Sequence, residues 1–226
     1  MKPAKPRARR ALLWSLAVAA GLVLVVSLIV WRLVAATPSW WNPAEPLAAE
    51  NASRGEYLEN QVVTAFHKVR PAGGRLWTLE LDANWINAWF ATRLPLWAAN
   101  RNLSWAHSVS DVNISIEGDR LRLGVRYGPG ESGQAYAIEC RPILDATGRL
   151  TLDNVRLHAG RLPIPLGLAS ESLAGITRST PELHAILSGQ SIEPTVRLSD
   201  GRRVRLMQMK IEGDRLVLTL ETLPER

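Results

Sequence analysis

The sequence has few of the residues from which disulfides and metal sites are built. Cys140 is the only cysteine, so no disulfide can form within the chain. The four histidines are scattered, and none has a second histidine or a cysteine at the spacing of a metal site. Cys140 lies within an expected strand, where a small buried apolar side chain is its usual role. We therefore expect no metal ion, no cofactor and a fold that depends on its core alone.

Sequence signatures of catalysis are missing as well. No Gly-x-Ser-x-Gly and no Ser-x-x-Lys sequence occurs. Residues 128–133 are rich in glycine, but they lack the lysine and the following helix of a phosphate-binding loop. We predict that the protein is not an enzyme. The alternative is a hydrolase, which would require the fold to bring His107 or His158 next to carboxylates in a cleft.

Net positive charge is missing from most of the chain. The formal net charge is +6, but residues 37–226 hold 21 basic and 21 acidic residues. The excess comes from Arg32 and from a tail that contains Lys2, Lys5, Arg7, Arg9 and Arg10. Nucleic-acid binding needs a basic face on the folded domain itself. We therefore exclude nucleic acid as a partner.

One long run without charged residues lies near the N-terminus. Leu12–Val30 is such a run, and at about 1.5 Å per residue a helix of this length crosses the roughly 30 Å hydrocarbon layer. The basic tail before it predicts a cytoplasmic N-terminus, with the remaining chain outside the membrane. We predict a single-pass protein of the cytoplasmic (inner) membrane with four parts: a basic tail (1–10), an anchor (11–36), a connector (37–49) and an extracytoplasmic domain (50–226).

Arginine and tryptophan residues mark the edges of this anchor. Arginine side chains can extend to lipid headgroups, and tryptophan rings favour the interface. We predict interface positions for Arg10, Trp31, Arg32, Trp40 and Trp41. The alternative is a cleaved signal peptide, because residues 34–36 would suit a cleavage site. The apolar run is longer than that of a signal peptide and an arginine follows it, which favours a retained anchor.

Helical spacing dominates the first part of the expected domain. Ser53 and Glu56 have the spacing of a capping box, and the apolar residues after them predict an amphipathic helix at about 53–70. A strand is expected at 75–81, and Asp82 is placed to cap a second helix. One face of that second helix carries Ile86, Trp89, Phe90 and Leu94.

From residue 109 onward, apolar and polar residues alternate, and turn sequences such as Gly118-Asp119 separate the runs. The pattern predicts an antiparallel meander with strands at 109–117, 120–127, 134–144, 149–158, 193–199, 202–212 and 215–222. Two short helices are expected between the fourth and fifth of these strands, after Pro165 and after Thr180. The predicted fold class is α+β: an N-terminal transmembrane helix, then one domain with a curved antiparallel β-sheet of about eight strands packed by two to four helices.

One short sequence occurs twice. Ile-Glu-Gly-Asp-Arg-Leu stands at residues 116–121 and again at 211–216. The repeat indicates either a duplicated sheet unit or two independent uses of Gly-Asp as a tight turn. The second interpretation is favoured, because the residues on either side do not match.

Aromatic residues gather in one stretch, which contains Trp77, Trp85, Trp89, Phe90, Trp97 and Trp105. The simplest interpretation is a core cluster, above all for Trp89 and Phe90. Alternatively, some of these rings line an apolar cavity or meet the membrane. The candidate ligand-binding residues are Trp85, Trp89, Phe90, Leu94, Trp97 and Trp105.

Residues 155–165 read Val-Arg-Leu-His-Ala-Gly-Arg-Leu-Pro-Ile-Pro. This segment, with the helix expected after it, resembles the strand, Gly-x-Leu-Pro-Ile/Leu-Pro turn and helix of the bacterial YpmS-like proteins. The stretch 81–87, at the start of the second helix, is similar to that family too. The resemblance, extended over residues 50–225, implies an N-terminally anchored envelope protein with an antiparallel sheet and no assigned reaction. Because Pro163 and Pro165 lack an amide hydrogen, we expect them to take the chain off the sheet edge.

Together these observations favour a non-enzymatic, membrane-anchored envelope protein that binds an apolar ligand, such as a lipid, near the membrane surface. The expected partners are the bilayer itself and that ligand. The alternative is an interaction or scaffold module that docks an envelope protein through a sheet edge or a tryptophan surface.

Overall fold

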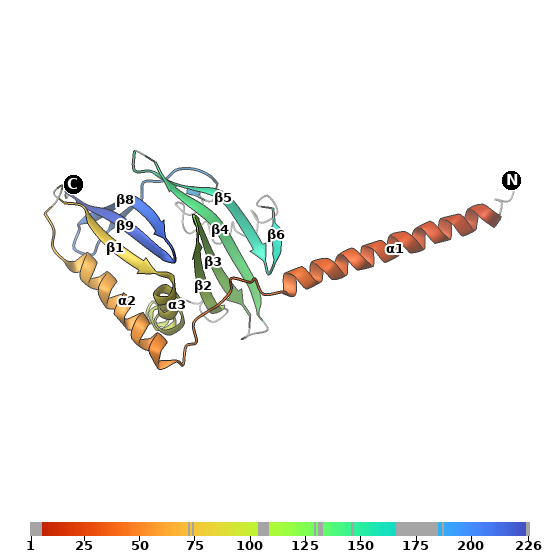
Figure 1. Cartoon of the computed structure of the whole chain (residues 1–226), viewed down its shortest axis with the longest axis horizontal. Coiled ribbons are helices and arrows are strands. Elements are labelled where there is room, and N and C mark those ends of the chain that lie inside the picture. Colours follow the sequence, from red (N-terminus) through yellow and green to blue (C-terminus); the bar gives the residue numbers. More distant parts are fainter. Residues whose placement is uncertain are drawn as a thin grey trace.

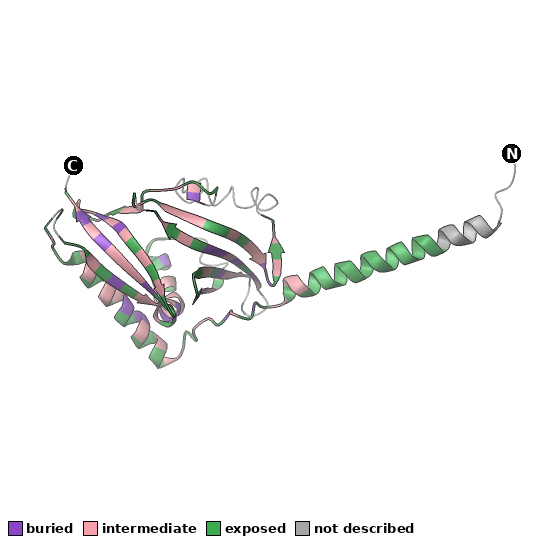
Figure 2. Cartoon of the chain, turned by 45° about the horizontal axis from the view of Figure 1, so that its top comes forward, coloured by how far each residue is buried: buried purple, intermediate pink, exposed green. Residues whose placement is uncertain are grey.

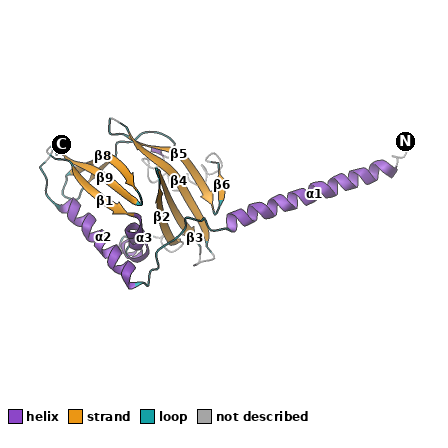
Figure 3. Cartoon of the chain, in the orientation of Figure 1, coloured by secondary structure: helices purple, strands orange, loops and turns teal. Residues whose placement is uncertain are grey.

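The computed structural model describes residues 6–71, 73, 75–103, 109–128, 130, 133–145, 147–165, 185–186 and 188–224. Within them, one long N-terminal helix projects from a domain of two antiparallel sheets and three further helices (Figure 1). The helices of the domain lie together at one side, beside the two sheets (Figure 3). This arrangement confirms the α+β class.

The projecting helix is α1 (Pro6–Ala35). Its part Trp14–Ala35 has a mean hydropathy of 2.4 and is long and apolar enough to cross a membrane. It extends away from the domain, and its described side chains are exposed except near the domain (Figure 2). Its length and composition are compatible with a membrane anchor or a signal sequence.

Helices α2 (Ala49–His67), α3 (Ala83–Thr92) and α4 (Leu94–Asn100) follow, with strand β1 (Trp77–Asp82) after α2. Asp82 caps α3 as predicted, since its carboxylate accepts hydrogen bonds from the backbone N–H groups of Asn84 (2.8 Å) and Trp85 (3.4 Å). The expected single helix carrying Leu94 is instead broken at Arg93. Pro95 follows that break, and a proline within a continuous helix would remove one hydrogen bond and clash with the preceding turn.

The five-stranded sheet has the order β2-β3-β4-β5-β6. Its strands are β2 (Val109–Glu117), β3 (Arg120–Tyr127), β4 (Gln134–Leu144), β5 (Leu150–Ala159) and β6 (Leu162–Ile164). The predicted meander is confirmed, with the bounds of its first three strands unchanged. The expectation that the chain leaves the sheet at Pro163 is wrong. Pro163 pairs with His158 in the edge strand β6, where a missing amide hydrogen is tolerated on the outer side.

The four-stranded sheet has the order β1-β9-β8-β7. Its further strands are β7 (Thr195–Arg197), β8 (Arg203–Glu212) and β9 (Arg215–Leu223). The expectation of one curved sheet is therefore wrong: the described strands form two. The physical reason is that β1 pairs with β9 from the end of the chain, while α3 and α4 separate β1 from β2. The helices expected after Pro165 and Thr180 fall largely outside the described residues.

The apolar faces of the two sheets meet in the core. One cluster of buried residues is built by the four-stranded sheet and contains Leu79, Val204, Leu206 and Leu220. A second cluster joins the sheets and contains Ala83, Ile116 and Leu216. Ile116 and Leu216 belong to the two copies of the repeated sequence. Each copy forms a hairpin, one in each sheet, and the two hairpins pack together.

Asn87 ties α3 to the open edge of the five-stranded sheet. Its side-chain Nδ2 donates to the carbonyl oxygen of Ile114 (2.9 Å), and its Oδ1 accepts from the N–H of Ile114 (2.7 Å). Asn87 is buried, so these bonds satisfy two backbone groups of the edge strand β2 away from water.

Candidate functional site

The five-stranded sheet has one apolar face and one polar face. Residues paired across neighbouring strands point to the same side of a sheet. One row of such partners consists of Ile114, Leu123, Ile138, Leu157 and Ile164. A second row, nearer to α1, consists of Val112, Val125, Tyr136, Ala159 and Leu162. We call the side that carries these two rows the apolar face.

Apolar side chains are usually buried and polar ones exposed, but several residues of this sheet show the reverse. On the apolar face, Ile116 is buried where the sheet meets the four-stranded sheet, and Ala159 in β5 is buried as well. Towards α1, Leu123 is 36% exposed and Tyr136 is 44% exposed. On the polar face, by contrast, Asn113 is 1% exposed and Glu139 is 9% exposed. The apolar face is therefore open to the surroundings around Leu123 in β3 and Tyr136 in β4, and its other described residues are partly or fully buried.

The polar face is covered by the segment that follows α1. A side chain at Gly124 would overlap the ring of Trp41, so the ring lies directly on the sheet. The guanidinium of Arg126 lies 5.5 Å from the centre of that ring and pairs with Asp111 at 3.1 Å. Trp41 is only 8% exposed. The ring of Trp41 thus packs into the domain, whereas the sequence predicts it at the membrane interface.

The other residues predicted for the membrane interface lie differently. Trp40 is half-buried, with its ring centre 5.7 Å from that of Trp41. Trp31 and Arg32 are exposed on α1, which leaves them free to meet headgroups. Arg10 lies in α1 outside the part whose side chains the structure describes.

The last turn of α1 and the residues just after it are bound by the turn between β5 and β6 and by Gln134 at the start of β4. The backbone N–H of Arg161 donates to the carbonyl oxygen of Leu33 (2.8 Å), and Nε2 of Gln134 donates to that of Val34 (2.7 Å). Nε of Arg161 donates to the carbonyl oxygen of Thr37 (2.9 Å). The first two bonds satisfy carbonyl groups in the last turn of α1, which has no further helical turn to supply donors, and the third holds the segment just after the helix. We call this set of contacts the anchor joint.

Charged residues pair on the polar face around Glu139. Its carboxylate accepts from Arg122 (2.8 Å) and Arg120 (2.6 Å), and Arg122 also reaches Glu117 (2.5 Å). Burial alone would raise the pKa of Glu139, but the hydrogen bonds and charges of the two arginines outweigh it. The pKa of Glu139 is therefore lower than that of an ordinary glutamate.

We expect this ion pair to give the domain an acid-sensitive part of its stability. Because the folded-state pKa of Glu139 is depressed, its contribution is present above the unfolded pKa of roughly 4.3 and is lost as the pH falls through the folded pKa. Glu139→Gln should lower the unfolding free energy by about 2 kcal/mol at pH 7. Denaturant titrations of both proteins from pH 7 to pH 3 check this: the difference between them should shrink towards zero. A difference that stays constant over this range would contradict it.

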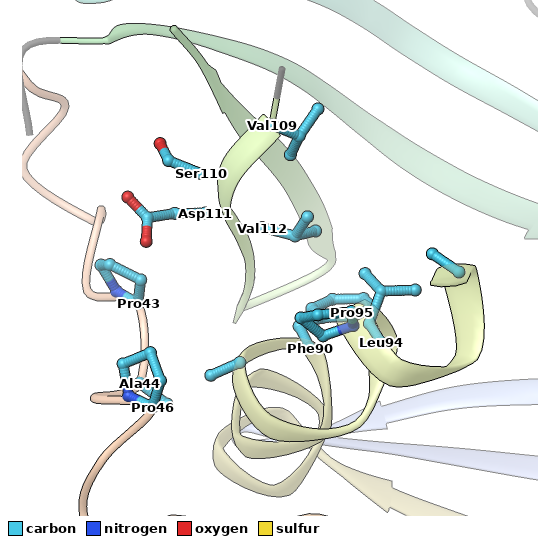
Figure 4. Close-up of a pocket in the computed structure, with 12 residues that line it drawn as sticks. Pro43, Ala44, Pro46, Phe90, Leu94, Pro95, Val109, Ser110, Asp111 and Val112 are labelled. Atoms are coloured by element: carbon cyan, nitrogen blue, oxygen red, sulfur yellow. The ribbon is translucent and has the colours of Figure 1, made fainter. Parts of the chain in front are cut away.

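Phe90 and Leu94 line one cavity between α3, α4, β2 and the segment after α1 (Figure 4). The opposite wall consists of Pro43, Ala44 and Pro46, and the cavity volume is about 90 Å³. Pockets for drug-sized ligands are usually ~300–1,000 Å³. This cavity is thus too small to enclose a lipid.

The predicted tryptophans do not gather around this cavity. Trp85 packs edge-on against Tyr57, with ring centres 4.9 Å apart, and Trp89 packs against Phe90 at 5.9 Å. Trp97 is 44% exposed and lies 5.4 Å from the guanidinium of Arg101. Trp105 lies outside the described residues. The six candidates therefore do not form one binding site among the described residues.

Known proteins offer no guide to this site. No family model, curated protein or solved structure matches the chain. The resemblance of residues 155–165 to the YpmS-like proteins therefore stays a prediction. In this structure, Gly160 and Arg161 of that segment form the turn of the anchor joint.

Groups that could perform chemistry are sparse in the part of the chain that the structure describes. No cluster of three histidine, cysteine or acidic side chains suited to a metal is found there. His158 lies on the polar face, where burial lowers its pKa. Burial also raises the pKa of the Cys140 thiol, so Cys140 stays protonated at neutral pH. His107 falls outside the described residues.

Sequence reasoning missed the open apolar face. The period-two alternation of residues 109–164 was a sufficient signal for which side chains share a face. It contained no signal for which face is covered, because Trp41 lies far away in the sequence from the strands that it packs on.

Proposed function

We propose that this protein is a retained single-pass membrane protein whose domain binds the hydrocarbon of a membrane lipid on its apolar face, without catalysing a reaction. The observation that carries the proposal is the open apolar face beside the end of α1. Single exposed apolar residues are common on proteins, but a contiguous apolar surface marks a binding site.

Retention of α1 is supported by the anchor joint. Cleavage after Ala36 would remove Leu33 and Val34, whose carbonyl oxygens accept from Arg161 and Gln134. The backbone N–H of Arg161 would then lose its partner, and Nε2 of Gln134 would lose the shorter of its two hydrogen bonds. A removable signal peptide has no need of such contacts with the mature domain. The basic tail before α1 supports a cytoplasmic N-terminus and a domain on the outer side.

A lipid is the occupant that the position of the face favours. The row nearest to α1 ends at Leu162 in β6, and α1 contacts β4, β5 and β6. The open face therefore begins where α1 leaves the bilayer, so acyl chains are the most concentrated apolar ligand within reach. Each buried methylene group contributes about 0.8 kcal/mol, so a few methylene groups on this face suffice for measurable binding.

Leu123→Asp tests this assignment, because it places a charge in the middle of the open face. A charge beside hydrocarbon costs more than 1.4 kcal/mol, so lipid co-purified with the full-length protein should fall about tenfold. The measurement is quantitative lipid extraction from the protein purified in mild detergent.

Ile143→Asp is the matched control. Ile143 is an aliphatic residue of the same sheet with similar exposure, 41% against 36% for Leu123. It pairs with Thr151 and points to the opposite face. Ile143→Asp should leave the amount of bound lipid unchanged. Equal loss of lipid in both variants would contradict the placement of the lipid site on the apolar face.

A second candidate function is docking of an envelope protein. It is favoured by α4, where Leu96 is 56% exposed and Trp97 is 44% exposed. Trp97→Ala should then abolish capture of a crosslinked partner while lipid content is unchanged, because large aromatic side chains dominate protein interfaces.

A further inference from the structure

The anchor joint fixes how the domain meets its membrane. α1 leaves the domain at the end of the sheet where β6 forms the edge (Figure 1). Arg32, one residue before Leu33, is exposed, and so is Arg161, whose N–H binds the Leu33 carbonyl oxygen. The guanidinium groups of Arg32 and Arg161 therefore lie near the point where α1 enters the membrane. Arginine side chains at such positions bind the phosphates of headgroups.

Gly160 is what allows the turn to approach the helix so closely. Its φ is +56°, and a Cβ there would overlap the carbonyl oxygens of Leu33, Val34 and Ala36. Any other residue would both strain this backbone conformation and push α1 away.

Trp41 holds the chain at a second point. The ring of Trp41 lies on Gly124 and under Arg126, seven residues after Val34. A segment bound at both ends cannot act as a swivel, so the domain keeps one orientation relative to α1.

We infer that edge strand β6, with Arg32 and Arg161, is a membrane-contact surface that binds phospholipid headgroups, and that Gly160 holds it there by docking the domain on the end of α1. The inference rests on the proposed retention of α1 as an anchor. It adds the place at which the apolar face meets the bilayer: the β6 edge.

The test uses the full chain in phosphatidylcholine–phosphatidylglycerol vesicles that contain a lipid with a nitroxide on its headgroup. A fluorescent label is attached at Pro163→Cys, which is exposed in β6, or at Lys210→Cys, which is exposed in β8 of the other sheet. Cys140 is buried and its thiol pKa is raised, so it reacts slowly with the label. The nitroxide should quench the label at residue 163 strongly and the label at residue 210 weakly.

Gly160→Val should lower the quenching at residue 163 towards that at residue 210. Gly148→Val is the matched control, because Gly148 also has a positive φ, +77°, but has no neighbour near its missing Cβ. Gly148→Val introduces comparable backbone strain without touching α1. Quenching of the label at residue 163 in this variant should therefore equal that in the parent protein. If Gly160→Val does not fold, the double variant Gln134→Ala, Arg161→Ala removes the side-chain part of the joint and should lower quenching in the same direction.

Equal quenching at residues 163 and 210 would overturn the inference, as would equal quenching in the Gly160 and Gly148 variants. If Leu123→Asp loses bound lipid but the label at residue 163 is still quenched more than the label at residue 210, lipid binding on the apolar face and membrane contact of β6 are separate properties. An intact pattern in a protein that never binds lipid would refute the lipid-binding function alone.

Discussion

Asn87→Ala should lower the free energy of unfolding by about 3 kcal/mol, because it leaves the N–H and the C=O of Ile114 buried without partners. Each of these groups now bonds the Asn87 amide at less than 3.0 Å. Water cannot replace the amide easily, since Asn87 is only 8% exposed. Chemical denaturation of the full-length protein in detergent measures the change.

Asn84→Ala is the control for Asn87→Ala. It removes the same side chain from the same helix, α3, but Asn84 is exposed and its Nδ2 reaches only Asp214, at 3.5 Å. Exposed substitutions of this kind usually change stability by less than about 0.5 kcal/mol. Equal effects of the two substitutions would show that the pairing of Asn87 with β2 does not stabilise the fold.

Trp41→Ala should be similarly costly, at about 3 kcal/mol, because it removes a large buried ring from the polar face. For a domain of this size the expected decrease in melting temperature is about 6–12 °C. The loss also uncovers Gly124 and removes the ring beside Arg126. Thermal unfolding followed by near-UV circular dichroism measures it.

Trp31→Ala provides the comparison for Trp41→Ala. Trp31 is 63% exposed on α1 and touches none of the sheet contacts described above. If Trp41 is an interface residue, as the sequence alone predicts, the two substitutions should have equally small effects on unfolding. A melting temperature that falls only in Trp41→Ala instead confirms that this ring belongs to the fold.

Much of the meander could be predicted from local signals. The strands Val109–Glu117 and Arg120–Tyr127 have their predicted bounds, because a Gly-Asp turn separates two alternating runs. The cap at Asp82 was also predictable, since capping depends on neighbouring residues only.

What could not be predicted depends on contacts between distant residues. The two-sheet arrangement follows from the pairing of β1 with β9, which are far apart in the sequence. Pro163 was expected to end the sheet, yet it is accommodated because β6 is an edge strand. The tryptophan-rich stretch was predicted to contain a binding site, but its rings contact different neighbours: Trp85 packs on Tyr57, and Trp97 lies beside Arg101. The face that the structure leaves open consists of aliphatic residues and Tyr136, outside the tryptophan-rich stretch.

The most direct test of lipid binding is native mass spectrometry of the full-length protein released from lipid nanodiscs, with extraction and identification of whatever stays bound. The proposed function predicts a lipid adduct of defined stoichiometry in the parent protein and in Ile143→Asp, and its loss in Leu123→Asp. A parent protein that carries no lipid, also after incubation with added phospholipid, would contradict the proposed function.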